Sequence, residues 1–301
     1  MNTDLILRLK SILKVDFTFE QIHKGFSQDV KYKLFISDKT YLLRISDFKN
    51  FANRKREFEI MQFLYKNEVK CNKPILIDTF QEGEKMNCFT LFSFIEGVDL
   101  QFCLKEYSKE LQYENGFEAG KDLKRIHEFS FEKNDWKERK AKKHFSYISE
   151  YKKINYSFSE EKIIEEFINK NLICLEAEKN CLLHDDFHVG NLISENGKYA
   201  GVIDFNRIDS GDFVHDFVKL GWFSKEISID FAKGQLDGYF KNNEIPMKFW
   251  QKYSVYMAMS IFATIVWYVK FHPDLIEELE SKIKMILKDH DNFNLLKPIW
   301  A

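Results

Sequence analysis

Three oxygen-bearing side chains in one short, β-rich segment could bind a metal ion and activate a hydroxyl group. Residues 181–205 contain Asp186, Asn191 and Asp204. A carboxylate such as Asp186, on a loop that leaves an apolar strand, can accept the proton of an attacking hydroxyl. The amide oxygen of Asn191 and the carboxylate of Asp204 are hard ligands, which suit Mg²⁺. The segment therefore predicts chemistry on a hydroxyl group beside a bound Mg²⁺.

A hairpin is expected to bring two of these residues together. Asn196-Gly197 is the strongest short signal for a two-residue β-turn, because a type I′ turn needs positive φ at both central positions. Pairing outward from that turn places Asn191 and Asp204 at the same end of the hairpin. We expect them to lie a few ångströms apart, as metal ligands must.

The elements around this segment change character along the chain. After an amphipathic first helix, residues 18–22, 31–36 and 40–45 are rich in β-forming residues and predict an antiparallel meander. Residues 51–65 predict a helix, and 73–79 and 87–95 predict two further strands. From about Asp99 onward the pattern is mainly helical. The chain is therefore expected to be α+β, with a small sheet followed by a helical part.

Composition excludes several classes of protein. A chain of 301 residues is long enough for about two domains. Its net charge of −2 gives no basic excess for binding nucleic acid. Five scattered cysteines are typical of free thiols in a reducing cytoplasm. The apolar run 253–271 carries polar residues and predicts a buried core helix, so no membrane association is expected.

These motifs resemble the aminoglycoside phosphotransferase and choline kinase-like family, small-molecule relatives of the protein kinases. Residues 184–191 resemble the family's H-G-D-x-H-x-x-N, with Asp185 in place of Gly, and 201–205 resemble its metal-binding strand. Residues 209–217 resemble the following G-D-P-x-x-D-L stretch, and the likeness extends over 19–268. It implies a bilobal protein-kinase-like fold, with a small antiparallel β N-lobe with one helix (residues 1–94) and a mainly helical C-lobe (95–301).

The resemblance also implies a nucleotide site in the N-lobe. The strand cation that contacts phosphates is usually Lys and is Arg44 here, with Glu57 or its competitor Glu59 as its helix partner. Phe92, at the back of the expected base pocket, could favour GTP over ATP. The remaining implied contacts are a phosphate loop and the backbone of an interlobe hinge, and they comprise Gly25, Ser27, Ser93 and Ile95.

The implied activity is a cytoplasmic, Mg²⁺-dependent transfer of the γ-phosphate of ATP or GTP to a hydroxyl of a small molecule. Asp186 would be the catalytic base, and Asn191 and Asp204 would hold the metal. His127 and His184 are expected to be structural. The protein would act as a monomer or homodimer.

The sequence leaves the acceptor open. An aminoglycoside-type antibiotic is favoured, bound by Asp209, Asp212 and Asp216, with choline, a macrolide or an amino sugar as alternatives. Three other readings remain. The first is a metal-dependent hydrolase built on His184, Asp186 and His188. The second is a nucleotide-binding pseudoenzyme, and the third a protein kinase.

Overall fold

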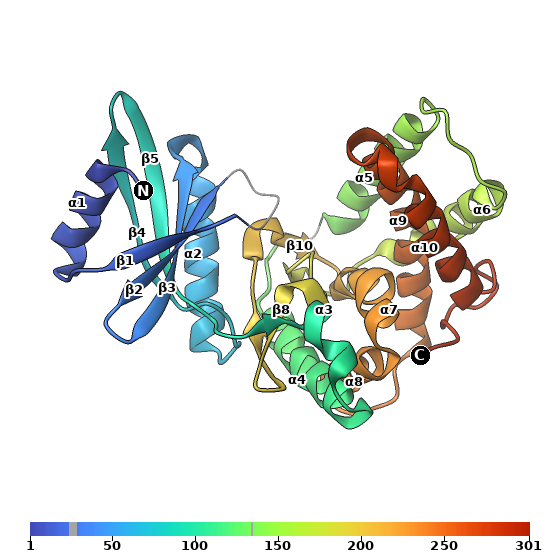
Figure 1. The fold of residues 1–301 in the computed structure, drawn as a ribbon. Helices are drawn as coiled ribbons and strands as arrows, with labels where there is room; N and C mark the ends of the chain where they lie inside the picture. Colours follow the sequence, from blue (N-terminus) through green and yellow to red (C-terminus); the bar gives the residue numbers. More distant parts are fainter. Residues whose placement is uncertain (24–28, 134) are drawn as a thin grey trace. The chain divides into compact units, whose positions relative to one another are not determined.

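The computed structural model describes residues 1–23, 29–133 and 135–301, and the chain divides into two compact units (Figure 1). Unit 1 comprises Met1–Gly97 and Ala200–Asn206, and unit 2 comprises Val98–Tyr199 and Arg207–Ala301. The sequence placed the division at residue 94 and assigned 200–206 to the second domain. Residues 200–206 join unit 1 because the Val202 N–H donates to the Lys70 carbonyl at 2.8 Å.

Unit 1 is built on a five-stranded antiparallel sheet in the order β1-β2-β3-β5-β4. The expected meander is present in β1 to β3, whereas β5 pairs with β3 and leaves β4 at the edge. Two helices accompany this sheet, the amphipathic first helix and the helix at 51–65, and the sequence predicts both. The elements are α1 (Thr3–Leu13), β1 (Thr18–Ile22), β2 (Val30–Ile36), β3 (Lys39–Asp47), α2 (Phe51–Lys66), β4 (Pro74–Glu82) and β5 (Lys85–Ser93).

Helices α1 and α2 lie on opposite sides of this sheet (Figure 1). Leu5 and Leu9 of α1 are fully buried in one apolar cluster with Leu43 of β3. On α2, the ring of Phe58 lies 6.4 Å from that of Phe92. Because neighbouring side chains on a strand point to opposite faces, the residue after Leu43 faces α2. That residue is Arg44.

Unit 2 is mainly helical, and its short strands support the candidate catalytic segment. Strand β7 pairs with β10, and β8 lies between β6 and β9. Strand β9 runs from unit 2 into unit 1. The elements are β6 (Val98–Asp99), α3 (Leu100–Cys103), α4 (Lys109–Glu128), α5 (Trp136–Tyr151), α6 (Glu161–Asn171), β7 (Cys181–Leu183), β8 (Leu192–Glu195), β9 (Lys198–Val202), β10 (Asp209–Gly211), α7 (Lys225–Ile227), α8 (Ile229–Phe240), α9 (Met247–Phe271) and α10 (Ile276–Asp289).

Helices α4 and α8 touch backbone to backbone through glycines. A Cβ added to Gly116 or Gly120 of α4 would lie 2.1 Å from the Phe231 carbonyl oxygen or 2.2 Å from that of Gln235. Gly234 on α8 meets α4 just as closely, with its own added Cβ 2.2 Å from a carbonyl oxygen. Only glycine allows this approach, which fixes α4 and α8 as one rigid pair.

Helix α9 is long and apolar enough to cross a membrane by length and composition. In unit 2, however, 56% of its most apolar stretch is buried inside the protein. Tyr253, Tyr256 and Phe262 are among the largest fully buried side chains of the described residues. The helix therefore provides the core of unit 2, as the sequence predicts.

Candidate active site

The loop after β7 is fixed by one buried carboxylate. Asp216 is fully buried; its Oδ2 accepts from the His184 N–H at 2.9 Å and its Oδ1 accepts from the Asp185 N–H at 2.7 Å. The same Oδ2 lies 3.0 Å from Nε2 of His127, at the end of α4. Tyr239 of α8 bonds the other ring nitrogen of His127 at 2.9 Å. The rigid α4–α8 pair thus holds the candidate catalytic loop in position.

Asp185 occupies a backbone conformation that favours glycine. Its φ is +58°, in the left-handed region, which explains why the related motif carries Gly at this place. The bond from its N–H to Asp216 helps to hold this conformation. Nδ1 of His215 lies 3.0 Å from Asp185 Oδ1, and the Lys140 ammonium donates to Nε2 of the same imidazole. Burial lowers the pKa of Lys140 to about 8.

Asp186 and Asn191, two of the predicted catalytic residues, lie in direct contact. The Nδ2 of Asn191 donates to the Asp186 carbonyl oxygen at 2.9 Å and to its Oδ2 at 3.2 Å. Within the described ranges no hydrogen bond uses Oδ1 of Asn191. That oxygen remains for a cation, which fits the predicted role in binding Mg²⁺.

The carboxylate of Asp186 is surrounded by positive charge. Its Oδ1 lies 3.0 Å from Lys219 Nζ, 3.6 Å from His188 Nε2 and 3.8 Å from Arg207 Nη1. Burial raises the pKa of Asp186, but the hydrogen bond from His188 and the charges of Lys219 and Arg207 outweigh burial and hold that pKa well below its usual range. Asp186 is therefore an anion at neutral pH, as a proton acceptor must be.

Unit 1 contains the expected cation and its carboxylate partner. Nη1 and Nη2 of Arg44 donate to Oε1 and Oε2 of Glu57, both at 2.8 Å. Glu57 is buried and Glu59 is exposed, so the structure selects Glu57 between the two candidates. Across the described residues, the Arg44 Nε–H makes no hydrogen bond and lies 3.8 Å from Asp29 Oδ2. This donor is buried beside that carboxylate.

Sequence reasoning missed three residues around Arg44, and one of them, Asn206, links Arg44 to Asp204. Asn206 Oδ1 accepts from Arg44 at 2.7 Å and from Arg54 at 2.9 Å, while its Nδ2 donates to Asp204 Oδ1. Arg54 also donates to Asp29 at 2.5 Å. Arg54 precedes Glu57 by three residues on α2, a spacing that places both on one helix face and could have indicated it. Asp29 and Asn206 carry no local signal of this kind.

The nucleotide contacts expected at the hinge and the phosphate loop stay predictions. The Ser93 N–H donates to the Lys73 carbonyl at 2.8 Å, and the Ser93 carbonyl accepts from Asn72 at 2.9 Å. A purine contact at Ser93 would therefore use the second lone pair of the Ser93 carbonyl oxygen. Ile95, the other hinge candidate, is half-buried. Gly25 and Ser27 lie outside the described residues.

Phe92 packs against the guanidinium of Arg44. Its side chain is buried, and its ring centroid lies 5.4 Å from the Arg44 guanidinium carbon. The guanidinium therefore stacks on an aromatic face as well as pairing with Glu57.

The three acidic residues predicted to bind the acceptor are all engaged inside unit 2. Asp212 is buried, and its Oδ2 accepts from Lys252 at 2.7 Å and from the Tyr256 hydroxyl at 3.0 Å. Asp216 holds the catalytic loop. Asp209 lies 3.2 Å from Arg139. Acidic residues after a catalytic loop do not reveal from spacing alone whether they face solvent or the interior. Burial removes Asp212 and Asp216 from the acceptor site, whereas the role of the partly exposed Asp209 stays a prediction.

The turn between β8 and β9 has the predicted form. Asn196 and Gly197 have φ of +51° and +80°, positive at both central positions. Asn191 immediately precedes β8, and Asp204 follows the end of β9 by two residues. Asp204 is exposed and, like Asn191, offers oxygen donors, so the donor chemistry of both residues fits Mg²⁺.

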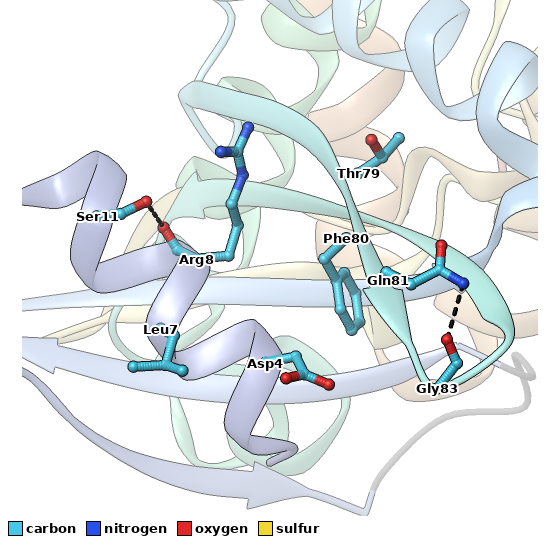
Figure 2. Close-up of a pocket in the computed structure, with 8 residues that line it drawn as sticks. All are labelled: Asp4, Leu7, Arg8, Ser11, Thr79, Phe80, Gln81 and Gly83. Carbon is cyan, nitrogen blue, oxygen red and sulfur yellow. Dashed lines mark hydrogen bonds between the residues drawn. The ribbon is translucent and has the colours of Figure 1, made fainter.

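A hollow elsewhere in unit 1 contains none of these residues. It has a volume of about 730 Å³ and opens between α1 and β4 (Figure 2). Leu7 and Arg8 line one side, and Phe80 and Gln81 line the other.

Comparison with known proteins identifies the family. The profile of the phosphotransferase enzyme (APH) family matches residues 18–250, so the chain belongs to that family. Among curated proteins, no relative matches significantly.

Solved structures share the fold at low sequence identity. A putative aminoglycoside phosphotransferase from Ralstonia eutropha is 14% identical, covers 94% of this chain and 96% of its own, and superposes with a TM-score of 0.68. The streptomycin–ATP ternary complex of APH(2")-IIa is 19% identical (88% and 90% covered, TM-score 0.63). The GDP complex of aminoglycoside 2'-phosphotransferase-IIIa is 11% identical (97% and 99% covered, TM-score 0.64). The predicted α+β, kinase-like fold class is confirmed.

Proposed function

We propose that this protein is a Mg²⁺-dependent kinase that transfers the γ-phosphate of ATP or GTP to a hydroxyl group of a small molecule. The observation that carries the proposal is the contact between Asp186 and Asn191. An anionic carboxylate lies there beside an amide whose oxygen makes no other described hydrogen bond, which supports the roles of proton acceptor and metal ligand. Membership of the phosphotransferase family supports the reaction class.

Each residue has a defined task in this reaction. Asp186 orients the acceptor hydroxyl and takes its proton as the phosphoryl group moves. Asn191 and Asp204 hold Mg²⁺, which neutralises phosphate charge when it is bound. Arg44 supplies positive charge for the nucleotide phosphates, with Glu57 fixing the guanidinium plane.

The acceptor and cellular setting form the finer part of the proposal. Similar structures include complexes with streptomycin and gentamicin, so aminoglycosides, and with them antibiotic resistance, are the first class to test. Choline, a macrolide and an amino sugar follow. The described cysteines are free, which suits a cytoplasmic enzyme.

The structure gives the hydrolase alternative little support. Nδ1 of His188 accepts from the Gly190 N–H at 3.1 Å, and His184 is fully buried. The described residues place three potential metal ligands together at Asp185, His215 and Asp216 instead. There the Lys140 ammonium already binds His215, and both oxygens of Asp216 accept backbone N–H groups.

Mg²⁺-dependent release of nucleoside diphosphate tests the proposal. We expect ATP or GTP to bind in the presence of Mg²⁺ and to turn over slowly without an acceptor. Asp204→Asn should weaken binding of the Mg-nucleotide, while Asp38→Asn, an exposed carboxylate in a turn of the same unit, should not. Two results would refute the assignment of Asp204. One is nucleotide binding that does not depend on Mg²⁺, and the other is an equal loss of Mg-nucleotide affinity in the two variants.

The choice between ATP and GTP has its own test. Phe92→Met replaces the buried ring with a flexible side chain of smaller cross-section. If Phe92 restricts the base pocket, this variant shifts the ratio of ATP to GTP turnover towards ATP. An unchanged ratio would show that Phe92 does not set the donor preference.

A further inference from the structure

The cations around Asp186 are more numerous than its catalytic task requires. Lys219 and Arg207 belong to the same unit as Asp186 and share one of its carboxylate oxygens, at 3.0 and 3.8 Å. The side chain of Arg207 is 58% exposed and that of Lys219 is 24% exposed. Two accessible full charges therefore face a single carboxylate.

These cations lie where an acceptor binds in the proposed function. The acceptor hydroxyl must reach Asp186, so a group next to that hydroxyl comes within reach of Lys219 and Arg207. The nucleotide phosphates have Arg44 and Mg²⁺ in the proposed function, so an anionic group on the acceptor is the natural partner of this second pair of cations.

The surrounding carboxylates do not offset this charge for a cationic acceptor. Nδ1 of His215 lies 3.0 Å from Asp185, and Arg139 and Lys252 pair with Asp209 and Asp212. Asp216 is fully buried. A polyamine-like acceptor brought to Asp186 would meet two like charges and carboxylates that are already paired.

We propose that the acceptor carries an anionic group, a carboxylate or a phosphate ester, close to the hydroxyl that is phosphorylated, and that Lys219 and Arg207 bind this group. The inference rests on the proposed kinase function and specifies its substrate class. Arg is suited to bidentate binding of either anion, and Lys219 supplies a second point of attachment. The pair acts as a specificity determinant that rejects cationic acceptors.

Matched probes of one carbon skeleton test the proposal: glucose, glucosamine, gluconate and glucose 6-phosphate, with gentamicin and streptomycin beside them. Their binding is measured by ligand-observed NMR with MgADP present, and acceptor-stimulated nucleoside-diphosphate release is measured in parallel. We expect an anionic probe to bind about tenfold more tightly than glucose, as one added charge pair allows. Anionic probes that bind no better than glucose, or tighter binding of gentamicin or streptomycin, would overturn the inference.

Variants assign the effect to these side chains. Lys219→Met and the more exposed Arg207→Gln should each remove most of the advantage of gluconate and glucose 6-phosphate over glucose. Lys233 is an exposed lysine of α8, and Lys233→Met is the matched control. This control should keep the advantage of the anionic probes over glucose. If Lys219→Met weakens only MgATP, or lowers turnover equally for every acceptor, Lys219 serves the nucleotide and the inference is wrong. Acceptor-independent, Mg²⁺-dependent release by the wild-type protein tests the kinase function separately.

Discussion

Asp216→Asn is the substitution that separates an anchoring role from an acceptor-binding role most clearly. The two oxygens of Asp216 accept from two backbone N–H groups, of His184 and Asp185, and contact His127. An asparagine has one acceptor oxygen, so one of these buried N–H groups must lose its partner. The imidazole of His127 can adapt by changing tautomer, because Tyr239 on its other nitrogen can donate or accept.

The expected cost follows from that count. Leaving one buried backbone N–H unsatisfied costs about 1–3 kcal/mol, and the left-handed Asp185 then loses part of what holds its strained backbone. We expect Asp216→Asn to lower the free energy of unfolding by about 2 kcal/mol. Turnover should fall as well, because the loop that carries Asp186 loses an anchor.

Urea unfolding followed by far-ultraviolet circular dichroism measures this loss. Asp209→Asn is the control, because Asp209 is a partly exposed carboxylate in an ion pair with Arg139. We expect that control to change stability by less than about 1 kcal/mol. The reasoning is refuted if Asp216→Asn is as stable as Asp209→Asn and raises only the acceptor KM, since that combination would mean that Asp216 binds substrate.

Three further substitutions test the packing and charges of unit 2. Lys252→Met leaves Asp212 as a buried charge without a cation, and it should lower the free energy of unfolding in urea by about 3–5 kcal/mol. The double variant Asp212→Asn/Lys252→Met should recover at least half of that free energy. Equal losses in the single and double variants would contradict the assignment. Gly120→Ala should lower the free energy of unfolding by about 2 kcal/mol, since an added Cβ 2.2 Å from a carbonyl oxygen forces α4 and α8 apart. An unchanged or higher Tm would refute the close contact between these helices. Burial and the charge of Lys140 lower the pKa of His144 from 6.5 to about 4, so the folded protein favours the neutral ring. The resulting contribution to the free energy of unfolding is fully present above pH 6.5 and is lost as the pH falls towards 4. Between pH 6.5 and 4, His144→Phe should lose less free energy of unfolding than the wild-type protein, by up to about 3 kcal/mol. His23→Gln, at an exposed histidine, should lose as much as the wild-type protein. If the free energy of unfolding of His144→Phe falls with pH in parallel with that of the wild-type protein, the assignment is contradicted.

Local patterns predicted the elements well, because their signals lie within a few residues. The β-rich runs, the helix 51–65 and the turn at Asn196-Gly197 depend on alternation, helical period and turn chemistry, and the structure contains each of them. The glycines of α4 and α8 carried no such signal, although they decide how those helices pack. A glycine in a helix indicates a close approach only when its neighbour in space is known.

The geometry of the candidate site was predictable where two residues stand at a short, fixed spacing. Asp186 and Asn191 are five residues apart on one loop, and the structure brings them into contact. Lys219 and Arg207 reach Asp186 from other segments and could not be inferred from local spacing. Conversely, Asp212 and Asp216 looked like an acidic patch for an acceptor but lie buried, because their partners come from distant helices.

The most direct test of the central claim compares the wild-type protein with Asp186→Asn. The measurement is acceptor-stimulated release of nucleoside diphosphate with the probes above, together with the Kd of the Mg-nucleotide on the same samples. The substitution keeps the shape of the side chain and removes its ability to take a proton. We expect turnover to fall by about 100-fold or more while the Kd stays unchanged. Turnover that survives in Asp186→Asn would contradict Asp186 as the catalytic base, and loss of Mg-nucleotide binding would assign it a structural role instead.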